Sequence, residues 1–167
     1  FSSSVSVSGT QTINLTSRTT QNITSSGVVF TTAINFSNVG STIVLQDDLS
    51  VSGSGSIVSS GIFDANNKNV TLFDLQVNTT LNMGSGLWSL TGTGTVWSAS
   101  QGTVNTGSAN IILTDTSTSE RDFDGGSNSY NKLTIGGSSG TSTLVMFGNA
   151  TYSELSSTKT VAHTITF

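Results

Sequence analysis

The feature that most constrains the fold is a repeat built from short strand-like segments. Residues 61–72 and 102–113 align without a gap. Both segments begin with the pattern Gly-x-apolar-Asp/Asn. Both end with the pattern Asn-apolar-x-Leu. The copies begin about 40 residues apart, and half of this offset, about 20 residues, is a plausible length for one coil of a β-solenoid, because structural repeats span roughly 20–50 residues.

Apolar residues alternate with polar ones between these repeats and around them. Residues 49–51 and 70–77 have this period of two, and clusters of Gly, Asn and Ser bound the runs at residues 52–55, 65–69 and 136–140. No stretch places apolar residues at helical spacing. The pattern predicts an all-β fold of short strands, most simply a parallel β-solenoid with Gly or Asn at its corners. An antiparallel β-sandwich also uses short alternating strands and is the alternative.

The composition fits stacked coils. Only 8% of the residues are charged, against about 25% in ordinary domains, and there is no Pro. Stacked like charges repel and Pro removes a ladder hydrogen bond, so both are disfavoured between coils. The segment before residue 41 aligns poorly with the rest. We therefore expect an N-terminal β segment at residues 1–40 and a repetitive solenoid at 41–167, within one continuous domain.

Charge and length exclude several classes of function. The net charge is -4 and the five basic residues are scattered, whereas nucleic-acid binding requires clustered Lys or Arg. No run approaches the ~20 apolar residues that span a bilayer. We expect neither a nucleic-acid partner nor membrane insertion. The absence of Cys removes disulfides and zinc–thiolate sites. Since the sequence begins at Phe1, we expect a processed chain or a piece of a longer one.

Three segments of the second half carry a resemblance. A corner with the pattern Gly-Thr-x-Asn-x-Gly begins at Gly102, and the pattern Phe-x-Gly-Gly-x-x-x-Tyr-Asn-x-Leu covers residues 123–133. The strand His-Thr-Ile-Thr-Phe ends the chain at residues 163–167. Their order resembles uncharacterised repetitive proteins predicted from phage and environmental viral genomes, over about residues 60–167. The resemblance implies a β-solenoid segment of a tail fibre, head fibre or similar virion appendage, and it carries over no catalytic residue.

Acidic residues are the first candidates for chemistry, because some solenoids degrade polysaccharides with two or three carboxylates on one face. The candidates are Asp47, Asp48, Asp64, Asp74, Asp115, Glu120, Asp122 and Asp124. Arg121 lies within the last group, which favours a solvated polar insertion loop. We expect no catalytic residues and no enzyme. The motif Gly-x-Ser-x-Gly at residues 136–140 and the single His163 indicate no nucleophile, because no strand–helix elbow is expected.

Two further kinds of site follow from residue type. Glu120, Asp122 and Asp124 are a candidate calcium site, although an EF-hand is excluded because Leu133 occupies the twelfth position of the loop. No cofactor is expected. Six Asn-x-Ser/Thr sequons are candidates for glycosylation. They begin at Asn14, Asn22, Asn35, Asn69, Asn78 and Asn149.

Aromatic residues suggest a binding surface. Trp88 and Trp97 lie close together in the sequence and, with Tyr130 and Tyr152, are candidates for stacking against glycans. The alternative is that the Trp side chains fill the thin core. The prediction for function is a non-catalytic structural or adhesive segment of a virion fibre, located on the virion surface or extracellularly. A bacterial surface adhesin or extracellular filament subunit is the alternative, and a polysaccharide-degrading enzyme is a third hypothesis. Expected partners are copies of itself, adjoining segments of a longer chain, or cell-surface glycans.

Overall fold

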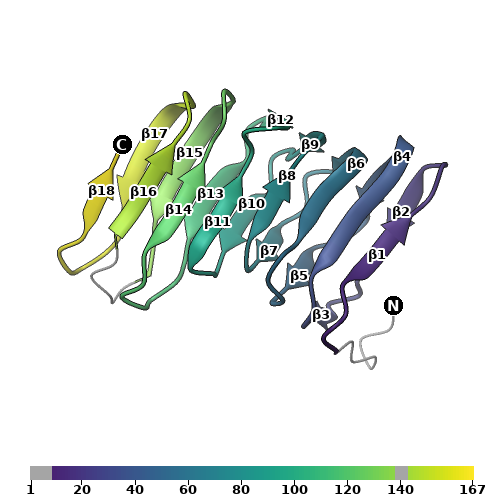
Figure 1. Cartoon of the computed structure of the whole chain (residues 1–167), viewed down its shortest axis with the longest axis horizontal. Helices are drawn as coiled ribbons and strands as arrows, with labels where there is room; N and C mark the ends of the chain where they lie inside the picture. Colours follow the sequence, from purple (N-terminus) through teal and green to yellow (C-terminus); the bar gives the residue numbers. More distant parts are fainter. Residues whose placement is uncertain (1–8, 138–142) are drawn as a thin grey trace.

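The computed structural model describes residues 9–137 and 143–167. They form a parallel β-solenoid of about 7 turns, with no helix in this part of the chain. The coils follow one another along the axis, so that the N-terminal and C-terminal strands lie at opposite ends of the stack (Figure 1). Every strand pairing between described residues is parallel. The predicted solenoid is confirmed, and the antiparallel sandwich is excluded.

Two sheets run the length of the rod. The seven-stranded sheet has the order β3 (Val29–Phe30), β5 (Leu49–Val51), β7 (Val70–Leu72), β10 (Leu87–Leu90), β13 (Asn110–Leu113), β15 (Ser129–Ile135) and β17 (Thr151–Ser157). The eleven-stranded sheet follows the path β1 (Ile13–Thr16), β4 (Ile34–Leu45), β6 (Ile57–Asp64), β8 (Leu75–Val77), β11 (Gly94–Ser98), β14 (Arg121–Asp124), β16 (Thr143–Phe147) and β18 (Thr164–Thr166). Off this path, β2 (Gln21–Ile23) pairs with β4, and β9 (Thr80–Asn82) pairs with β6 and with β12 (Thr103–Asn105).

The strand register explains the repeat found in the sequence. Val70 pairs with Trp88, and Trp88 pairs with Ile111. Phe63, Leu81 and Val104 form a second row of the same kind. The offset between the two copies therefore corresponds to two coils of unequal length, a shorter one that ends at Trp88 and a longer one that ends at Ile111. No break separates the two segments that were predicted to meet after Gly40, because β4 runs continuously across this point.

Inward side chains form a continuous core along the axis. Its aromatic rings contact one another from Phe36 through Phe63, Trp88, Trp97 and Phe123 to Tyr130 and Tyr152, with centroid separations between 4.1 and 6.3 Å. Strand alternation places these rings inside and the polar residues between them outside. The apolar run thus crosses most of the coils without interruption.

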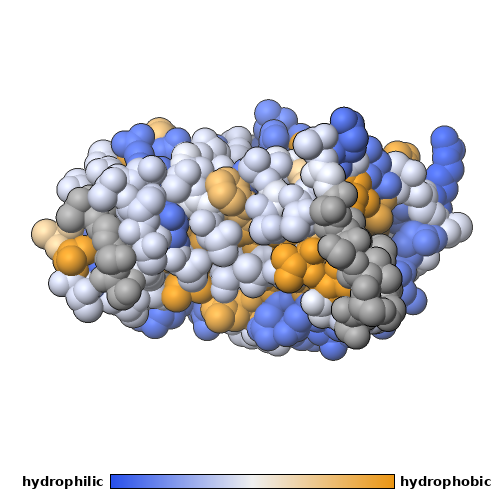
Figure 2. All heavy atoms as spheres, turned by 90° about the horizontal axis from the view of Figure 1, so that it is seen from below, coloured by the Kyte–Doolittle hydropathy of each residue, from blue (hydrophilic) through white to orange (hydrophobic). Residues whose placement is uncertain are grey.

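Outward side chains form polar ladders between coils. The Asn35 amide donates to Asn14 Oδ1 over 3.0 Å, and the Asn105 amide donates to Asn82 Oδ1 over 2.8 Å. An amide carries both donors and acceptors, so identical amides pair when stacked, whereas identical charges repel. This pairing favours Asn on the surface of stacked coils. Much of the face in Figure 2 is pale, the colour of residues with intermediate hydropathy such as Ser, Thr and Gly.

Candidate functional site

The four aromatic residues predicted to stack against glycans lie in or against the core. Trp88 and Trp97 are 0% exposed and Tyr130 is 3% exposed. Tyr152 is partly buried, with its ring 5.5 Å from that of Tyr130. The prediction of a surface platform is wrong, because strand alternation turns these rings inward and a buried indole or phenol needs an internal partner.

That internal partner is found within the core. Trp97 Nε1 donates to the Tyr130 hydroxyl over 2.9 Å, and this hydroxyl lies 3.1 Å from the carbonyl oxygen of Gly125, to which it donates. Burial raises the pKa of Tyr130. Burial and the nearby Asp124 carboxylate raise the pKa of Tyr152 to about 12. Both phenols are therefore neutral across the physiological range and serve packing.

The predicted metal site is not assembled. In β14, Asp122 and Asp124 point outward, and Glu120 lies exposed before the strand. Asp124 Oδ1 accepts a bond from the Gly126 N–H over 3.0 Å, which is a local turn contact. Among the residues with described positions, no three His, Asp or Glu side chains are grouped so that they could hold a metal ion. The structure therefore does not bring Glu120, Asp122 and Asp124 together as a calcium site.

Arg121 is the residue that sequence reasoning misplaced within this segment. Its side chain is 0% exposed, whereas a solvated acid–base group was predicted. Nη1 donates to the Asp115 carbonyl oxygen over 3.3 Å, and burial lowers the pKa of Arg121 while Asp115 opposes this effect. The alternation within the strand indicates this burial, because Arg121 lies two residues before the inward-facing Phe123 and so points to the same side. Arg121 thus ties the loop at residues 114–120 to the coil.

This loop is the predicted polar insertion. Gly94 of β11 pairs with Arg121 of β14, and the chain between these two partners is longer than the chain between Val70 and Trp88. The extra chain lies at residues 114–120, which are partly or fully exposed. The strands on both sides remain paired, so the insertion leaves the stack intact.

The remaining candidate carboxylates hold backbone N–H groups at coil corners. Asp47 accepts from the N–H groups of Ser25 and Ser26 over 2.7 and 2.6 Å. Burial opposes ionisation of Asp47, but these bonds outweigh it and its pKa lies below the ordinary value. Asp74 accepts from Gly55 and Ser56, yet burial dominates there and raises its pKa. Each carboxylate links one coil to the next, which is a structural role.

Asp48 also links two coils, whereas Asp64 makes a local turn contact. Asp48 Oδ1 accepts from the Asn69 N–H over 2.8 Å, and Asp64 Oδ1 accepts from the Asn66 N–H over 2.8 Å. Since Asn66 has a positive φ of 49°, the second bond stabilises a left-handed corner.

The single histidine lies beside a serine near the C-terminal end. His163 Nε2 is 3.1 Å from Ser157 Oγ, and Nδ1 is 3.1 Å from the Val161 carbonyl oxygen. A carbonyl accepts, so Nδ1 carries a proton and donates to Val161. Ser157 Oγ lies within hydrogen-bond distance of both Nε2 and the Ile135 carbonyl oxygen. Ser157 Oγ also accepts from the Lys159 N–H, as in a hydroxyl-stabilised turn. The Gly-x-Ser-x-Gly motif at residues 136–140 lies partly outside the described residues.

The predicted glycosylation sites differ in access. Asn14, Asn22, Asn69 and Asn149 are exposed, whereas Asn35 and Asn78 are partly buried. Asn35 is held in a ladder, since it donates to Asn14 and accepts from Ser59 Oγ over 2.6 Å. Modification of Asn35 would require this ladder to open. Glycosylation at the four exposed positions stays a prediction.

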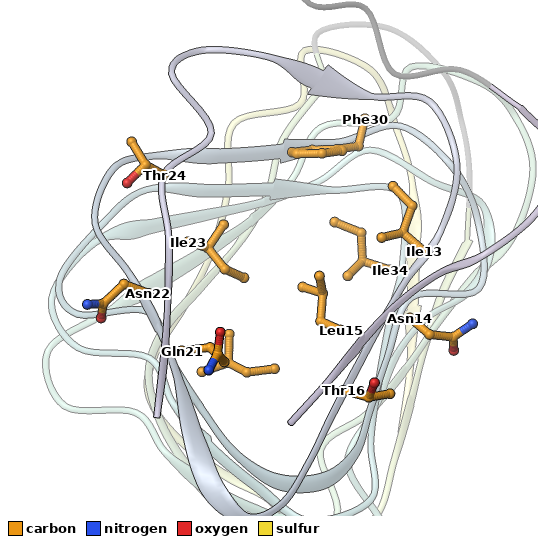
Figure 3. A pocket seen from close by; sticks show the side chains of 11 residues that line it. Ile13, Asn14, Leu15, Thr16, Gln21, Asn22, Ile23, Thr24, Phe30 and Ile34 are labelled. Carbon is orange, nitrogen blue, oxygen red and sulfur yellow. The ribbon is translucent and has the colours of Figure 1, made fainter. Parts of the chain in front are cut away.

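One hollow lies at the N-terminal end of the described part of the rod. A cavity of about 540 Å³ opens where the first coil ends, and Figure 3 shows Ile13, Leu15, Ile23 and Phe30 around it. Ile13, Leu15 and Ile23 are only partly buried, although they pack against the core. The hollow is therefore the core itself, seen at its end. A second hollow, of about 330 Å³, is a trough over β8 lined by Asp74, Gln76 and Ser98 among others.

Comparison with known proteins found no matching family model, no matching curated sequence and no matching solved structure. The resemblance to viral repetitive proteins therefore rests on the sequence motifs alone. Within the described ranges, no helix has the length and apolar character needed to cross a membrane.

Proposed function

We propose that the chain is a non-catalytic structural segment of a virion fibre or similar surface appendage. The observation that carries this proposal is the uninterrupted parallel stack of about 7 turns around one continuous core. Each strand of the interior shares backbone hydrogen bonds with strands on both sides, so the stack resists bending and presents the same kinds of side chain along its length. Such an element serves as a spacer that holds other parts of an assembly apart.

The side-chain contacts support this role. Asp47 and Asp48 accept from backbone N–H groups at corners, and the polar ladders join neighbouring coils. These contacts order the surface of the rod. The resemblance of residues 60–167 to viral repetitive proteins favours a virion over a bacterial surface. A bacterial adhesin or filament subunit depends on the same kind of rigid stack of coils and is the second candidate.

Immunogold electron microscopy tests the proposal. Antibodies against the folded protein are applied to intact particles and cells of the source, with pre-immune serum as the control. We expect gold along thin appendages of virions. Label on cell-surface filaments selects the bacterial candidate. Label confined to the cell interior contradicts both.

A polysaccharide panel tests the non-catalytic part of the proposal. We expect no loss of polymer length on incubation with the protein. Depolymerisation that disappears in Asp122→Asn, while Ser127→Ala retains it, would show that the chain is an enzyme. Ser127 is a suitable control because it is exposed and lies near β14.

A further inference from the structure

We infer that the trough over β8 binds an uncharged sugar residue of a glycan chain. The trough has a volume of about 330 Å³. Sites for small ligands usually measure about 300–1,000 Å³, so one or two sugar rings are the appropriate size. Such binding adds an activity to the structural role proposed above and does not depend on where the rod is located. The shape, the hydrogen-bonding groups, the apolar surface and the charge of the trough carry the inference.

The trough exists because one coil is shorter than its neighbours. Only residues 73–74 join β7 to β8, whereas residues 52–56 join β5 to β6 and residues 91–93 join β10 to β11. β8 lies between β6 and β11 in the sheet (Figure 1). Its register with β11 covers two residue pairs, although β14 pairs with β11 from Gly94 onwards. The short coil therefore recedes between two longer ones and leaves a hollow in the middle of the rod.

Asp74 lines this hollow with one of its two carboxylate oxygens still available. Oδ1 accepts from the N–H of Gly55 over 2.7 Å and from the N–H of Ser56 over 3.1 Å. No donor among the described residues bonds to Oδ2. Burial raises the pKa of Asp74, which indicates that water reaches the carboxylate incompletely. A carboxylate oxygen is a strong acceptor, so Oδ2 is suited to a hydroxyl group of a ligand.

Gln76 and Ser98 add groups that both donate and accept. They occupy opposed positions in the register of β8 and β11. Elsewhere on the rod opposed polar side chains bond to each other, as the Asn105 amide does to Asn82. Within the described structure, no hydrogen bond joins Gln76 to Ser98. The amide and the hydroxyl can therefore pair with sugar hydroxyls, which also donate and accept.

The trough also has an apolar part. Ile57 lines it from β6 and is partly exposed, since the next residue, Val58, is the one that points into the core. Leu75 lines it from β8. A sugar ring carries hydroxyl groups around its edge and C–H groups on its faces. Small-ligand sites combine an apolar lining with a few polar groups in the same way.

The charge around the trough selects a ligand without negative charge. Among the described residues that line it, Asp74 is the only charged one. Asp122 and Asp124 lie on the adjoining strand, opposite Thr95 and Ser98. These carboxylates repel phosphate, sulfate and uronic acid groups, which bind where Arg or Lys is present. An uncharged sugar residue satisfies the donors, the acceptors and the apolar surface without this repulsion.

Affinity electrophoresis tests the binding. The natural protein migrates through native gels cast with dextran, mannan or galactan, which are neutral polysaccharides, and through a gel cast with heparin, which is anionic. Serum albumin in the neighbouring lane corrects for sieving. We expect retardation in at least one neutral gel relative to a gel without polymer, and none in the heparin gel.

Two variants connect the retardation to the trough. Gln76→Ala removes the exposed amide. Asp74→Asn keeps an oxygen for the corner but replaces Oδ2 by an amide nitrogen, which cannot accept. We expect each variant to lower the apparent association constant about five- to tenfold, the effect of losing one or two hydrogen bonds. Gln46→Ala is the matched control, because Gln46 is also exposed but its amide bonds to Asn22 and does not line the trough. Melting temperatures show whether each variant is folded.

The outcomes separate clearly. Retardation that is lost in Gln76→Ala and kept in Gln46→Ala supports the inference. Unchanged migration in every neutral gel overturns it, as does retardation by heparin alone or an equal effect of the two Gln variants. These results do not depend on the immunogold experiment: label on appendages without retardation rejects only the sugar site, whereas retardation without such label rejects only the fibre.

Nuclear magnetic resonance locates the contact in the unmodified protein. An oligosaccharide cut from the retaining polymer is added to isotopically labelled protein. We expect the amide signals of residues 55–57, 74–76 and 95–98 to shift as the oligosaccharide concentration rises. Shifts confined to other parts of the rod would place the sugar elsewhere and overturn the inference.

Discussion

At the residue scale, the Tyr130 hydroxyl is the most informative group in the core. It accepts from Trp97 and donates to Gly125, whereas the buried Tyr152 hydroxyl has no hydrogen-bond partner among the described residues. Replacing Tyr130 by Phe leaves the buried Trp97 N–H unpaired, so we expect the free energy of unfolding to fall by about 1–3 kcal/mol. Denaturant titration measures this loss.

Tyr152→Phe is the matched control for this change. It removes a hydroxyl that has no partner to lose among the described residues, so we expect a change within about 0.5 kcal/mol, or a small gain in stability. Equal losses in the two variants would show that the hydrogen bond to Trp97 has no special role.

The same two phenols predict a loss of stability at alkaline pH. Burial raises both pKa values in the folded state, to about 12 for Tyr152, above the value of about 10 in an unfolded chain. Folding therefore favours the neutral phenol: the stabilising contribution is complete below about pH 10 and is lost as the pH rises toward the folded pKa. We expect the free energy of unfolding to fall between pH 10 and 12. The double variant Tyr130→Phe and Tyr152→Phe should show a shallower fall over that interval.

The sequence left the position of the tryptophans open, and the unequal coil lengths explain why. Trp88 pairs with Val70, which has an inward position, across one of the shorter coils. The interval from Trp88 to Ile111 is longer, and the interval from Gly94 to Arg121 is longer still. The two repeat copies lie two coils apart, so their offset gives only the combined length of these two coils. It does not give the length of either coil alone. The inward parity of Trp88 follows only when the intermediate coil is known.

At the element scale, the bend that joins the two halves of β6 depends on a glycine. Gly61 has a φ of 72°, and a Cβ placed there would clash with the carbonyl oxygen of Asn38 in the neighbouring coil. Asn38 is itself buried, and its amide donates to the carbonyl oxygens of Thr19 and Thr42. Because the contact is with backbone, it cannot relax by rotation of a side chain. The coils therefore approach each other closely at this bend.

We expect Gly61→Ala to prevent folding or to lower the melting temperature sharply. Gly94→Ala is the control, because Gly94 has a similar φ of 67° but nothing lies within 4 Å of an added Cβ. The control carries only the backbone strain of about 1–2 kcal/mol. Thermal denaturation of both variants measures the difference. If they lose the same stability, the close approach at Gly61 contributes nothing.

The outward carboxylates of β14 give a second test at this scale. Asp122 and Asp124 do not join a third ligand within the described structure, so we expect the fold to form without a bound ion. We expect a chelator to leave the melting temperature unchanged in differential scanning fluorimetry, with a buffer-only sample as the reference. A fall of ten degrees or more after chelation would contradict this interpretation of β14.

This strand also shows how far the local sequence can be interpreted. The segment before it, rich in Asp, Ser and Thr, predicts an exposed insertion, and residues 114–120 form one. Arg121 was assigned to the same solvated group on charge alone, yet the strand begins at this residue and turns it inward. The register of a strand decides whether a given side chain points into the core or toward solvent. A shift of the strand by one residue reverses this direction. Composition does not locate such a boundary.

At the scale of the whole molecule, each coil contacts only its neighbours, so stability should vary along the axis. Apolar residues in β7, β8 and β10 are mostly fully buried, whereas those in β1 and β18 are only partly buried. In such stacks the end units open more easily than the central ones. We expect amide hydrogen exchange to be slowest in β7, β8 and β10 and fastest in β1 and β18. Dilute protein is the appropriate sample, since association would protect the ends. Uniform protection along the chain would contradict the expectation.

The solenoid itself was the part best predicted from sequence. The offset between the repeats, the alternation and the Gly and Asn corners all describe local geometry, which a single chain records directly. The outer coils were harder, because they align poorly with the repeat. Function is harder still, because a rod acts through position and spacing, and neither requires a particular chemical group at one place.

The loop at residues 114–120 has a consequence for how such a rod can diversify. It adds chain between β13 and β14 while the strands above and below keep their partners. Substitutions and insertions in this loop therefore do not disturb the pairing of the strands. The strands determine how long the rod is, and the loop determines what protrudes from its side. A foreign peptide epitope grafted between Thr116 and Ser119 should remain displayed on a folded rod, so the molecule has a natural position for carrying new recognition sequences.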